Sequence, residues 1–120
     1  MPVPASELIS RAKAAIRCIS AEEAAQRIRT ESGLILLDVR EPEEHAKDSI
    51  SGSLNIPRGL LEMKIEDICS NPDQPILIHC AGGGRAALAT KSLQDMGYSA
   101  VSSIDARFSD LRSAVAGDGS

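Results

Sequence analysis

The chain has 120 residues, of which 42% are apolar and 25% are charged, a composition typical of one globular domain. Thirteen basic residues against 17 acidic ones give a net charge of −4, and no Lys/Arg-rich run occurs, which disfavours nucleic-acid binding. No stretch approaches the roughly 18 apolar residues of a membrane span, and no leader-peptide pattern opens the sequence. We therefore expect a cytoplasmic protein without a membrane anchor.

The aromatic and cysteine content narrows the choice of fold. The sequence has no Trp, and Tyr98 and Phe108 are its aromatic residues, so the core must be aliphatic, which suits a parallel sheet covered by helices. The cysteines, Cys18, Cys69 and Cys80, are odd in number and lack a CxxC spacing. This disfavours a disulfide framework or a thiol-based zinc site. We expect free thiols and no metal or organic cofactor.

The first predicted elements are two helices joined by an extended segment. Apolar residues recur on one helical face over residues 5–16, with Ser6 and Glu7 as candidates for the cap and first-turn acid. An extended segment follows at residues 17–19. Ser20 opens a capping-box pattern that predicts a helix to about residue 30.

Alternating strands and helices follow. The continuously apolar run 34–37 predicts a strand covered on both faces, with Asp38 and Arg40 near its carboxyl end. Pro42 suits the first turn of a short helix. The remaining predicted elements are short strands at 54–56 and 76–78, a strand at 99–104, and helices at 60–68, from 85 to 96, and at 108–115.

This alternation predicts an α/β fold with three layers, α/β/α, around a five-stranded, mainly parallel sheet. We divide the chain into an N-terminal helical extension at residues 1–16, a main domain at 17–116 and a flexible tail at 117–120. Sites in such sheets form outside the carboxyl ends of the strands. Both Asp38 and Cys80 are predicted to lie at that edge.

The loop after the predicted strand 76–78 carries the strongest chemical signal. It comprises Cys80, Ala81, Gly82, Gly83, Gly84 and Arg85. Three glycines before a helix allow several N–H groups to point inward, which forms an anion cradle at the positive end of the helix dipole. A cysteine beside these amides and an arginine is favoured as a thiolate. A tightly packed turn with a buried, inert cysteine is the structural alternative.

Three segments in this order resemble single-domain rhodaneses: residues 36–42 (LLDVREP), 50–57 (ISGSLNIP) and 80–86 (CAGGGRA). The resemblance covers roughly residues 19–115. It implies a thiosulfate sulfurtransferase-type enzyme in which Cys80 takes sulfane sulfur from a small-molecule donor such as thiosulfate and holds it as a persulfide. A thiophilic acceptor, such as a thiol or a thioredoxin-like protein, would then receive the sulfur.

Two other functions remain open at this point. Tyrosine phosphatases and related cell-cycle phosphatases place five residues between the cysteine and the arginine, whereas four separate Cys80 from Arg85. The shorter loop should fit a sulfur atom better than a phosphate. The second alternative is a non-catalytic rhodanese-like module that binds a partner or senses redox state.

Several charged residues are predicted to support the loop. Asp38 and Arg40 are expected to brace the strand end, with Glu44 as a candidate partner of Arg40. Arg85 is expected either to reach the bound anion or to hold the loop through an acid such as Asp38. Arg58 is a candidate contact for an anionic donor, or a solvated turn residue.

The remaining chemically active side chains have simpler interpretations. His45 and His79 are expected to be structural or exposed, because no further Cys or His stands at metal-ligand spacing. Cys18 and Cys69 are expected to be core or helix-side residues. Alternatively, Cys69 resolves the Cys80 persulfide as a disulfide.

Overall fold

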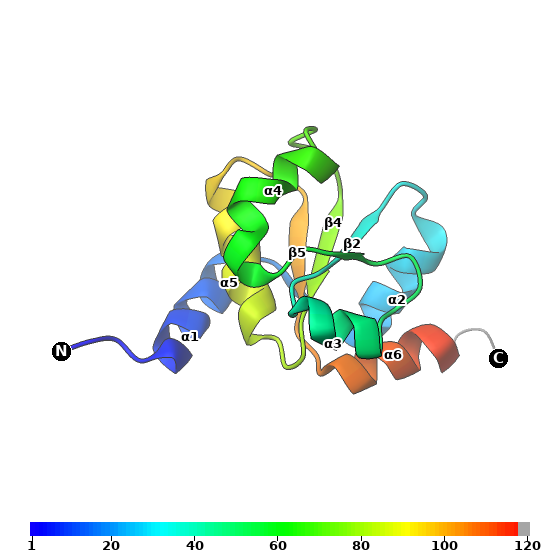
Figure 1. The fold of residues 1–120 in the computed structure, drawn as a ribbon, viewed down its shortest axis with the longest axis horizontal. Helices are drawn as coiled ribbons and strands as arrows, with labels where there is room; N and C mark the ends of the chain where they lie inside the picture. Colours follow the sequence, from blue (N-terminus) through cyan, green and yellow to red (C-terminus); the bar gives the residue numbers. More distant parts are fainter. Residues whose placement is uncertain (118–120) are drawn as a thin grey trace.

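The residues that form strands lie side by side in one sheet, in the order β1-β5-β4-β2-β3 (Figure 1). The structure is a computed structural model and describes residues 1–117. The strands are β1 (Cys18–Ile19), β2 (Ile35–Asp38), β3 (Leu54–Asn55), β4 (Ile76–His79) and β5 (Val101–Ile104). Every neighbouring pair is parallel. The predicted α/β class with a five-stranded sheet is therefore confirmed.

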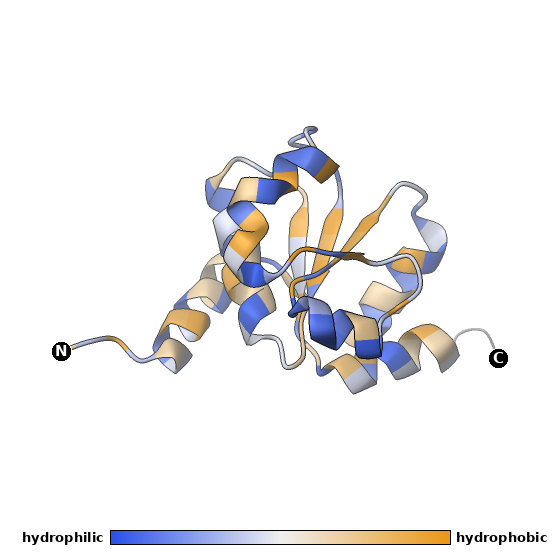
Figure 2. Cartoon of the chain, in the orientation of Figure 1, coloured by the Kyte–Doolittle hydropathy of each residue, from blue (hydrophilic) through white to orange (hydrophobic). Residues whose placement is uncertain are grey.

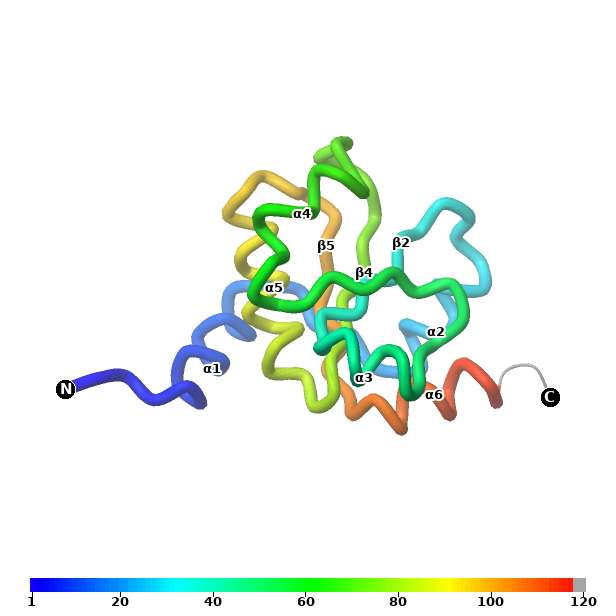
Figure 3. Tube along the Cα trace, in the orientation of Figure 1, coloured from blue at the N-terminus to red at the C-terminus, as the bar shows by residue number. Residues whose placement is uncertain are grey.

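Helices cover both faces of this sheet and complete the three layers. They are α1 (Ala5–Ala15), α2 (Ala21–Thr30), α3 (Pro42–Lys47), α4 (Leu61–Ile68), α5 (Gly84–Asp95) and α6 (Phe108–Gly117), with a 3₁₀ turn, η1 (Arg58–Leu60), before α4. Helices α4 and α5 pack on one face, and α2 and α6 on the other. Helix α1 lies against the outer side of α5 (Figure 3).

The core is aliphatic and divided in two by the sheet. Alternate residues of a strand point to opposite faces, so Leu37 and Ile78 meet α4 and α5, whereas Leu36 and Leu77 meet α2 and α6. Figure 2 shows the strands as the most hydrophobic part of the fold, with hydrophilic residues on the outer helices. Each fully buried Leu or Ile stabilises the fold by about 1.5–3 kcal/mol. Continuous burial along β4 explains why its sequence does not alternate.

Local sequence signals predicted two of the helix ends correctly and one incorrectly. The Ser20 hydroxyl accepts a hydrogen bond from the Glu23 N–H at 3.1 Å, which caps α2 as predicted. Gly97, with φ of +105°, follows the end of α5 in the expected left-handed conformation. The predicted capping role of Ser6 is wrong, because the N-cap of α1 is Pro4 and Ser6 already lies in the first turn.

The ends of the chain add two observations. Gly117 is the last residue of α6, and the rest of the predicted tail, residues 118–120, lies outside the described residues. Within residues 1–117, no helix is both long and apolar enough to cross a membrane.

Candidate active site

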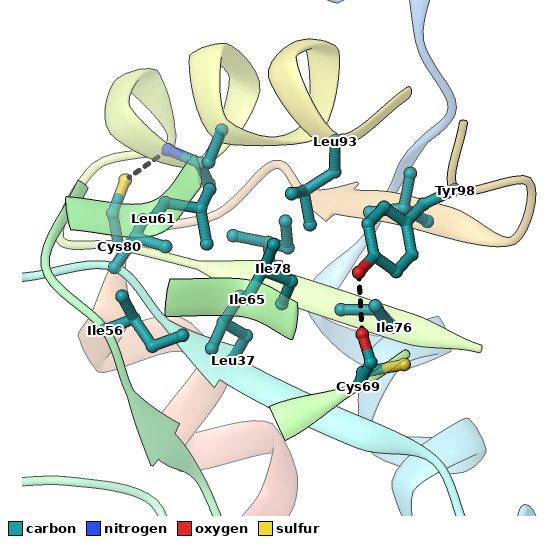
Figure 4. Close-up of a cluster of buried hydrophobic side chains, with 14 residues drawn as sticks. Leu37, Ile56, Leu61, Ile65, Cys69, Ile76, Ile78, Cys80, Leu93 and Tyr98 are labelled. Atoms are coloured by element: carbon teal, nitrogen blue, oxygen red, sulfur yellow. Dashed lines mark hydrogen bonds between the residues drawn. The ribbon is translucent and has the colours of Figure 1, made fainter. Parts of the chain in front are cut away.

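Cys80 follows β4 directly, and its side chain packs into the core on the α4 and α5 side, with 1% of its surface exposed. Its Sγ accepts hydrogen bonds from the N–H groups of Gly83, at 3.0 Å, and Ala86, at 3.3 Å. Figure 4 draws the second of these two hydrogen bonds. Gly83 has a φ of +101°, a conformation that residues with a Cβ adopt only under strain. The glycine-rich sequence thus lets the loop curl until its amides face the sulfur.

The first turn of α5 completes this amide environment. Helix α5 begins at Gly84 and buries Ala86, Ala89 and Leu93 against the sheet, which fixes its N-terminus beside the loop. The N–H groups at the start of a helix carry partial positive charge and lack intrahelical partners. Because one of them, from Ala86, already donates to Sγ, the positive end of the α5 dipole is directed at the sulfur.

Arg85 is held by Glu44 of α3. Its Nη1 and Nη2 donate to the two Glu44 carboxylate oxygens at 2.7 and 3.1 Å. Glu44 also accepts a hydrogen bond from the Glu41 N–H at 2.8 Å. The Arg85 hydrogen bonds, followed by that from Glu41, lower the pKa of Glu44 to about 2. Of the two roles predicted for Arg85, the structure shows the one in which it holds the loop through an acid, but that acid is Glu44 and not Asp38, and the pair ties α5 to α3.

Asp38 and Arg40 form a buried clamp at the end of β2. The fully buried Asp38 carboxylate accepts hydrogen bonds from Arg40 N, Nε and Nη2 at 2.9, 3.0 and 2.9 Å, and lies 2.8 Å from His45 Nδ1. Burial raises the pKa of Asp38, but the hydrogen bonds from Arg40 and His45 outweigh it and hold the pKa below its ordinary value. The candidate pairing of Arg40 with Glu44 is wrong, because Arg40 is committed to Asp38 and to the Asp48 carbonyl, 2.7 Å away.

Phe108 connects this clamp to the loop. The Arg40 guanidinium lies 4.0 Å from the ring centroid of Phe108, which in turn lies 5.7 Å from that of His79. The Phe108 N–H donates to the Ala81 carbonyl at 2.8 Å. Burial lowers the pKa of His79, and neither of its ring nitrogens has a hydrogen-bond partner among residues 1–117. His79 is thus a buried ring that lies beside Phe108, one residue before Cys80.

The other predicted site residues lie farther from the sulfur or have other partners. Arg58 donates from its backbone to Val39 at 3.0 Å and from its side chain to Glu62 at 2.9 Å. Cys69 is buried, and Figure 4 places it and Cys80 at opposite ends of one core cluster. The structure therefore does not bring these two sulfurs together for a disulfide.

Helix α1 and the loop after β5 contribute residues that sequence reasoning missed. The Cδ1 of Ile9 lies 2.9 Å from the position that a Cβ on Gly84 would take. The Asp105 carboxylate lies 3.3 Å from the equivalent position on Gly83 and accepts a hydrogen bond from Lys13 Nζ at 3.0 Å. No local motif could have found these residues, because the packing of α1 on α5 brings them to the loop.

No group of three or more His, Cys, Asp or Glu side chains among residues 1–117 is arranged to hold a metal ion.

The fold is thus that of an α/β protein with a cysteine at the carboxyl end of a central parallel strand. Loop amides donate to the sulfur of this cysteine, which suits a site for an anionic sulfur. The family model for the rhodanese-like domain matches residues 20–114. The chain belongs to the rhodanese-like domain family, as its motifs predicted.

Individual relatives agree with this assignment. A sulfurtransferase of Allochromatium vinosum is 30% identical over 83 residues, which cover 69% of this chain and 76% of that protein. A thiosulfate sulfurtransferase of Pseudomonas fluorescens is 32% identical over 91 residues, which cover 76% and 81%. The chain matches only 44% of the length of a Bacillus subtilis relative, which is 34% identical over 83 residues.

A solved structure from Rhodopseudomonas palustris resembles nearly the whole chain. It has a TM-score of 0.83 and 30% identity, and the match covers 95% of this chain and 92% of that one. That protein is described as of unknown function and a possible tyrosine phosphatase. The match extends beyond the family segment at residues 20–114, which does not include α1.

Proposed function

We propose that the protein is a sulfurtransferase that carries sulfane sulfur as a persulfide on Cys80. The observation that carries this proposal is the pair of N–H groups, from Gly83 and Ala86, that donate to the Cys80 sulfur. Such donors stabilise a thiolate before the reaction and a persulfide anion after it. The sulfurtransferase names of the A. vinosum and P. fluorescens relatives support the same activity.

In the first half-reaction the Cys80 thiolate attacks the sulfane sulfur of thiosulfate. A new S–S bond forms on Cys80, the S–S bond of thiosulfate breaks, and its electron pair leaves with sulfite. The terminal sulfur keeps the negative charge that it carried in thiosulfate, so the persulfide is an anion, and sulfite leaves as a dianion. No proton is transferred, so the site needs no general base.

In the second half-reaction a thiophilic nucleophile attacks the terminal sulfur and regenerates the thiolate. Cyanide would give thiocyanate, and a thiolate would give a new persulfide on the acceptor. We propose a small thiol or a thioredoxin-like protein as the acceptor, and the cytoplasm as the place of reaction. The free thiols of Cys18, Cys69 and Cys80 suit such a reducing compartment.

The phosphatase alternative is weaker for a geometric reason. In a phosphatase the loop arginine has to bind the phosphate, whereas both terminal nitrogens of Arg85 are occupied by Glu44. The loop also has four residues between Cys80 and Arg85 instead of five. Steady hydrolysis of an aryl phosphate that is lost in Cys80→Ser would favour a phosphatase over the sulfurtransferase.

Intact-mass measurement after treatment with thiosulfate tests the proposal directly. We expect the wild-type protein to gain the mass of one sulfur atom on Cys80 and to lose it when cyanide is added. Cys80→Ser should gain none, whereas Cys18→Ser, which removes an exposed thiol, should behave as wild type. If thiosulfate, 3-mercaptopyruvate and polysulfide all fail to load Cys80, the non-catalytic binding module becomes the better description.

A further inference from the structure

Helix α1, which precedes the family segment, presents two side chains to the catalytic loop. Ile9 and Lys13 are four residues apart and therefore lie on the same helical face. The Ile9 side chain packs against Gly84, where a Cβ would meet its Cδ1 at 2.9 Å. Gln94 of α5 donates to the Ala15 carbonyl at 3.1 Å and fixes the other end of α1. These contacts hold α1 in one position beside the loop.

The Lys13 ammonium is thereby placed close to the amide that holds the sulfur. Its Nζ lies 3.9 Å from the position that a Cβ on Gly83 would take. Gly83 is the residue whose N–H donates to Cys80 Sγ at 3.0 Å. A positive charge from outside the family segment thus lies beside the loop residue that donates to the Cys80 sulfur.

Two arginines near the loop, Arg85 and Arg40, are less able to bind an incoming anion. Arg85 makes two hydrogen bonds to Glu44, and Arg40 is clamped on the buried Asp38. The loop residues between Cys80 and Arg85 are one alanine and three glycines, which offer no charged side chain. Any charged side chain that helps the loop amides to bind the donor must therefore come from outside the loop.

Lys13 differs from these arginines because its ion pair is exchangeable. It donates a single hydrogen bond to Asp105, and the two side chains are 35% and 49% exposed. A solvated pair of this kind is weak and can exchange partners at little cost. Asp105 itself lies closer to Gly83 than Lys13 does, so its charge repels an anion unless Lys13 offsets it.

We propose that Lys13 is a specificity-determining residue that binds the oxoanion end of a small anionic sulfur donor, with Asp105 as the competitor that the donor displaces. The ligand class is an anion whose transferable sulfur lies next to a charged oxygen group, as in thiosulfate. This inference rests on the proposed sulfurtransferase function and names the residue that selects its donor.

Alkylation of Cys80 tests the effect of the Lys13 and Asp105 charges on an approaching reagent, without any sulfur transfer. Iodoacetate carries a negative charge and iodoacetamide is neutral, so the ratio of their rates at Cys80 reports the local field. We expect Lys13→Gln to lower the iodoacetate-to-iodoacetamide ratio about fivefold and Asp105→Asn to raise it by a similar factor. Arg11→Gln, which removes the same charge from the same helix, should leave the ratio unchanged.

Thiosulfate provides the second readout. Lys13→Gln should raise the thiosulfate concentration needed for half-maximal loading of Cys80 and leave the limiting loading rate near that of wild type. An unchanged alkylation ratio in Lys13→Gln and Asp105→Asn would overturn the inference, as would a Cys80 that reacts with neither reagent. If the ratio changes as expected but no donor loads Cys80, the proposed sulfurtransferase function fails, whereas the effect of the Lys13 charge on anions that approach Cys80 stands.

Discussion

Glu44 binds Arg85 through two hydrogen bonds of 2.7 and 3.1 Å and so joins α3 to the first turn of α5. The sequence motif of the loop ends at this arginine, yet its guanidinium is directed to a neighbouring helix. Glu44 accepts at the same time from the Glu41 N–H, so the carboxylate is positioned by its own helix before it meets Arg85. We interpret Arg85 as a residue that fixes the loop's shape.

Glu44→Gln is expected to lower the free energy of unfolding by about 1 kcal/mol at neutral pH, a value reduced for the solvent exposure of both partners. The pKa of Glu44 is about 2 in the folded protein, against an ordinary value of 4.5. A lowered pKa contributes stability above the ordinary value, and this contribution is lost as the pH falls from about 4.5 to about 2. Urea unfolding at several pH values measures the effect.

The difference in stability between wild type and Glu44→Gln should therefore be largest above pH 5 and disappear near pH 2. Glu31→Gln, which removes another arginine-paired carboxylate far from the loop, is the matched control. It should leave the rate of Cys80 loading unchanged, whereas Glu44→Gln should slow it. A difference that stays constant down to pH 2 would show that Glu44 is not held by Arg85 as described.

Asp38→Asn is expected to be much more damaging, because it leaves the Arg40 charge buried without its partner. Arg40 is 5% exposed and Asp38 is fully buried, and breaking such a pair costs about 3–5 kcal/mol. Thermal and urea unfolding would measure the loss. Asp48→Asn is a suitable control, because Arg40 contacts only the backbone carbonyl of that residue. Equal losses in the two variants would contradict the clamp.

The fold was largely predictable because its signals are local. The continuous apolar runs at 34–37 and 76–78 predicted the central strands β2 and β4, and the Ser20 pattern predicted where α2 begins. Their shared physical basis is burial on both faces of a parallel sheet. The polar residues that follow each run were thereby placed at the correct edge of the sheet.

The partners of the charged residues were not predictable in the same way. Arg40 has acids both before and after it in sequence, and spacing alone could not choose between Asp38 and Glu44. Burial decided the pairing, because the fully buried carboxylate requires the most complete set of donors. The contact of Lys13 with Asp105 depends on how α1 docks on α5, which no short motif encodes.

Phe108→Leu is expected to destabilise the fold by about 1–2 kcal/mol, since it removes the aromatic face under Arg40 and the ring beside His79. The backbone bond from residue 108 to Ala81 would remain, so the loop should keep its shape. We therefore expect lower thermal stability with a nearly unchanged rate of Cys80 loading. A large loss of loading with full stability would indicate that the ring acts on the sulfur itself.

Gly83 and Gly82 offer a direct comparison within the loop that follows Cys80. A Cβ on Gly83 would be strained at a φ of +101° and would lie 3.3 Å from the Asp105 carboxylate, whereas a Cβ on Gly82 would meet nothing within 4 Å. Gly83→Ala should therefore cost about 1–2 kcal/mol and displace the amide that donates to Cys80. Gly82→Ala should change stability little.

The rate at which thiosulfate loads Cys80 shows whether the Gly83 amide acts on the sulfur, when Gly83→Ala is compared with Gly82→Ala. We expect thiosulfate to load Gly83→Ala at least about tenfold more slowly than wild type. Removal of one N–H donor that stabilises an oxyanion typically lowers the rate about 10²–10³-fold. The expected effect here is smaller because the amide is displaced and not removed. Gly82→Ala should load at a rate close to that of wild type. If both variants load normally, the Gly83 amide does not stabilise the sulfur anion, and the loop would hold Cys80 by packing alone.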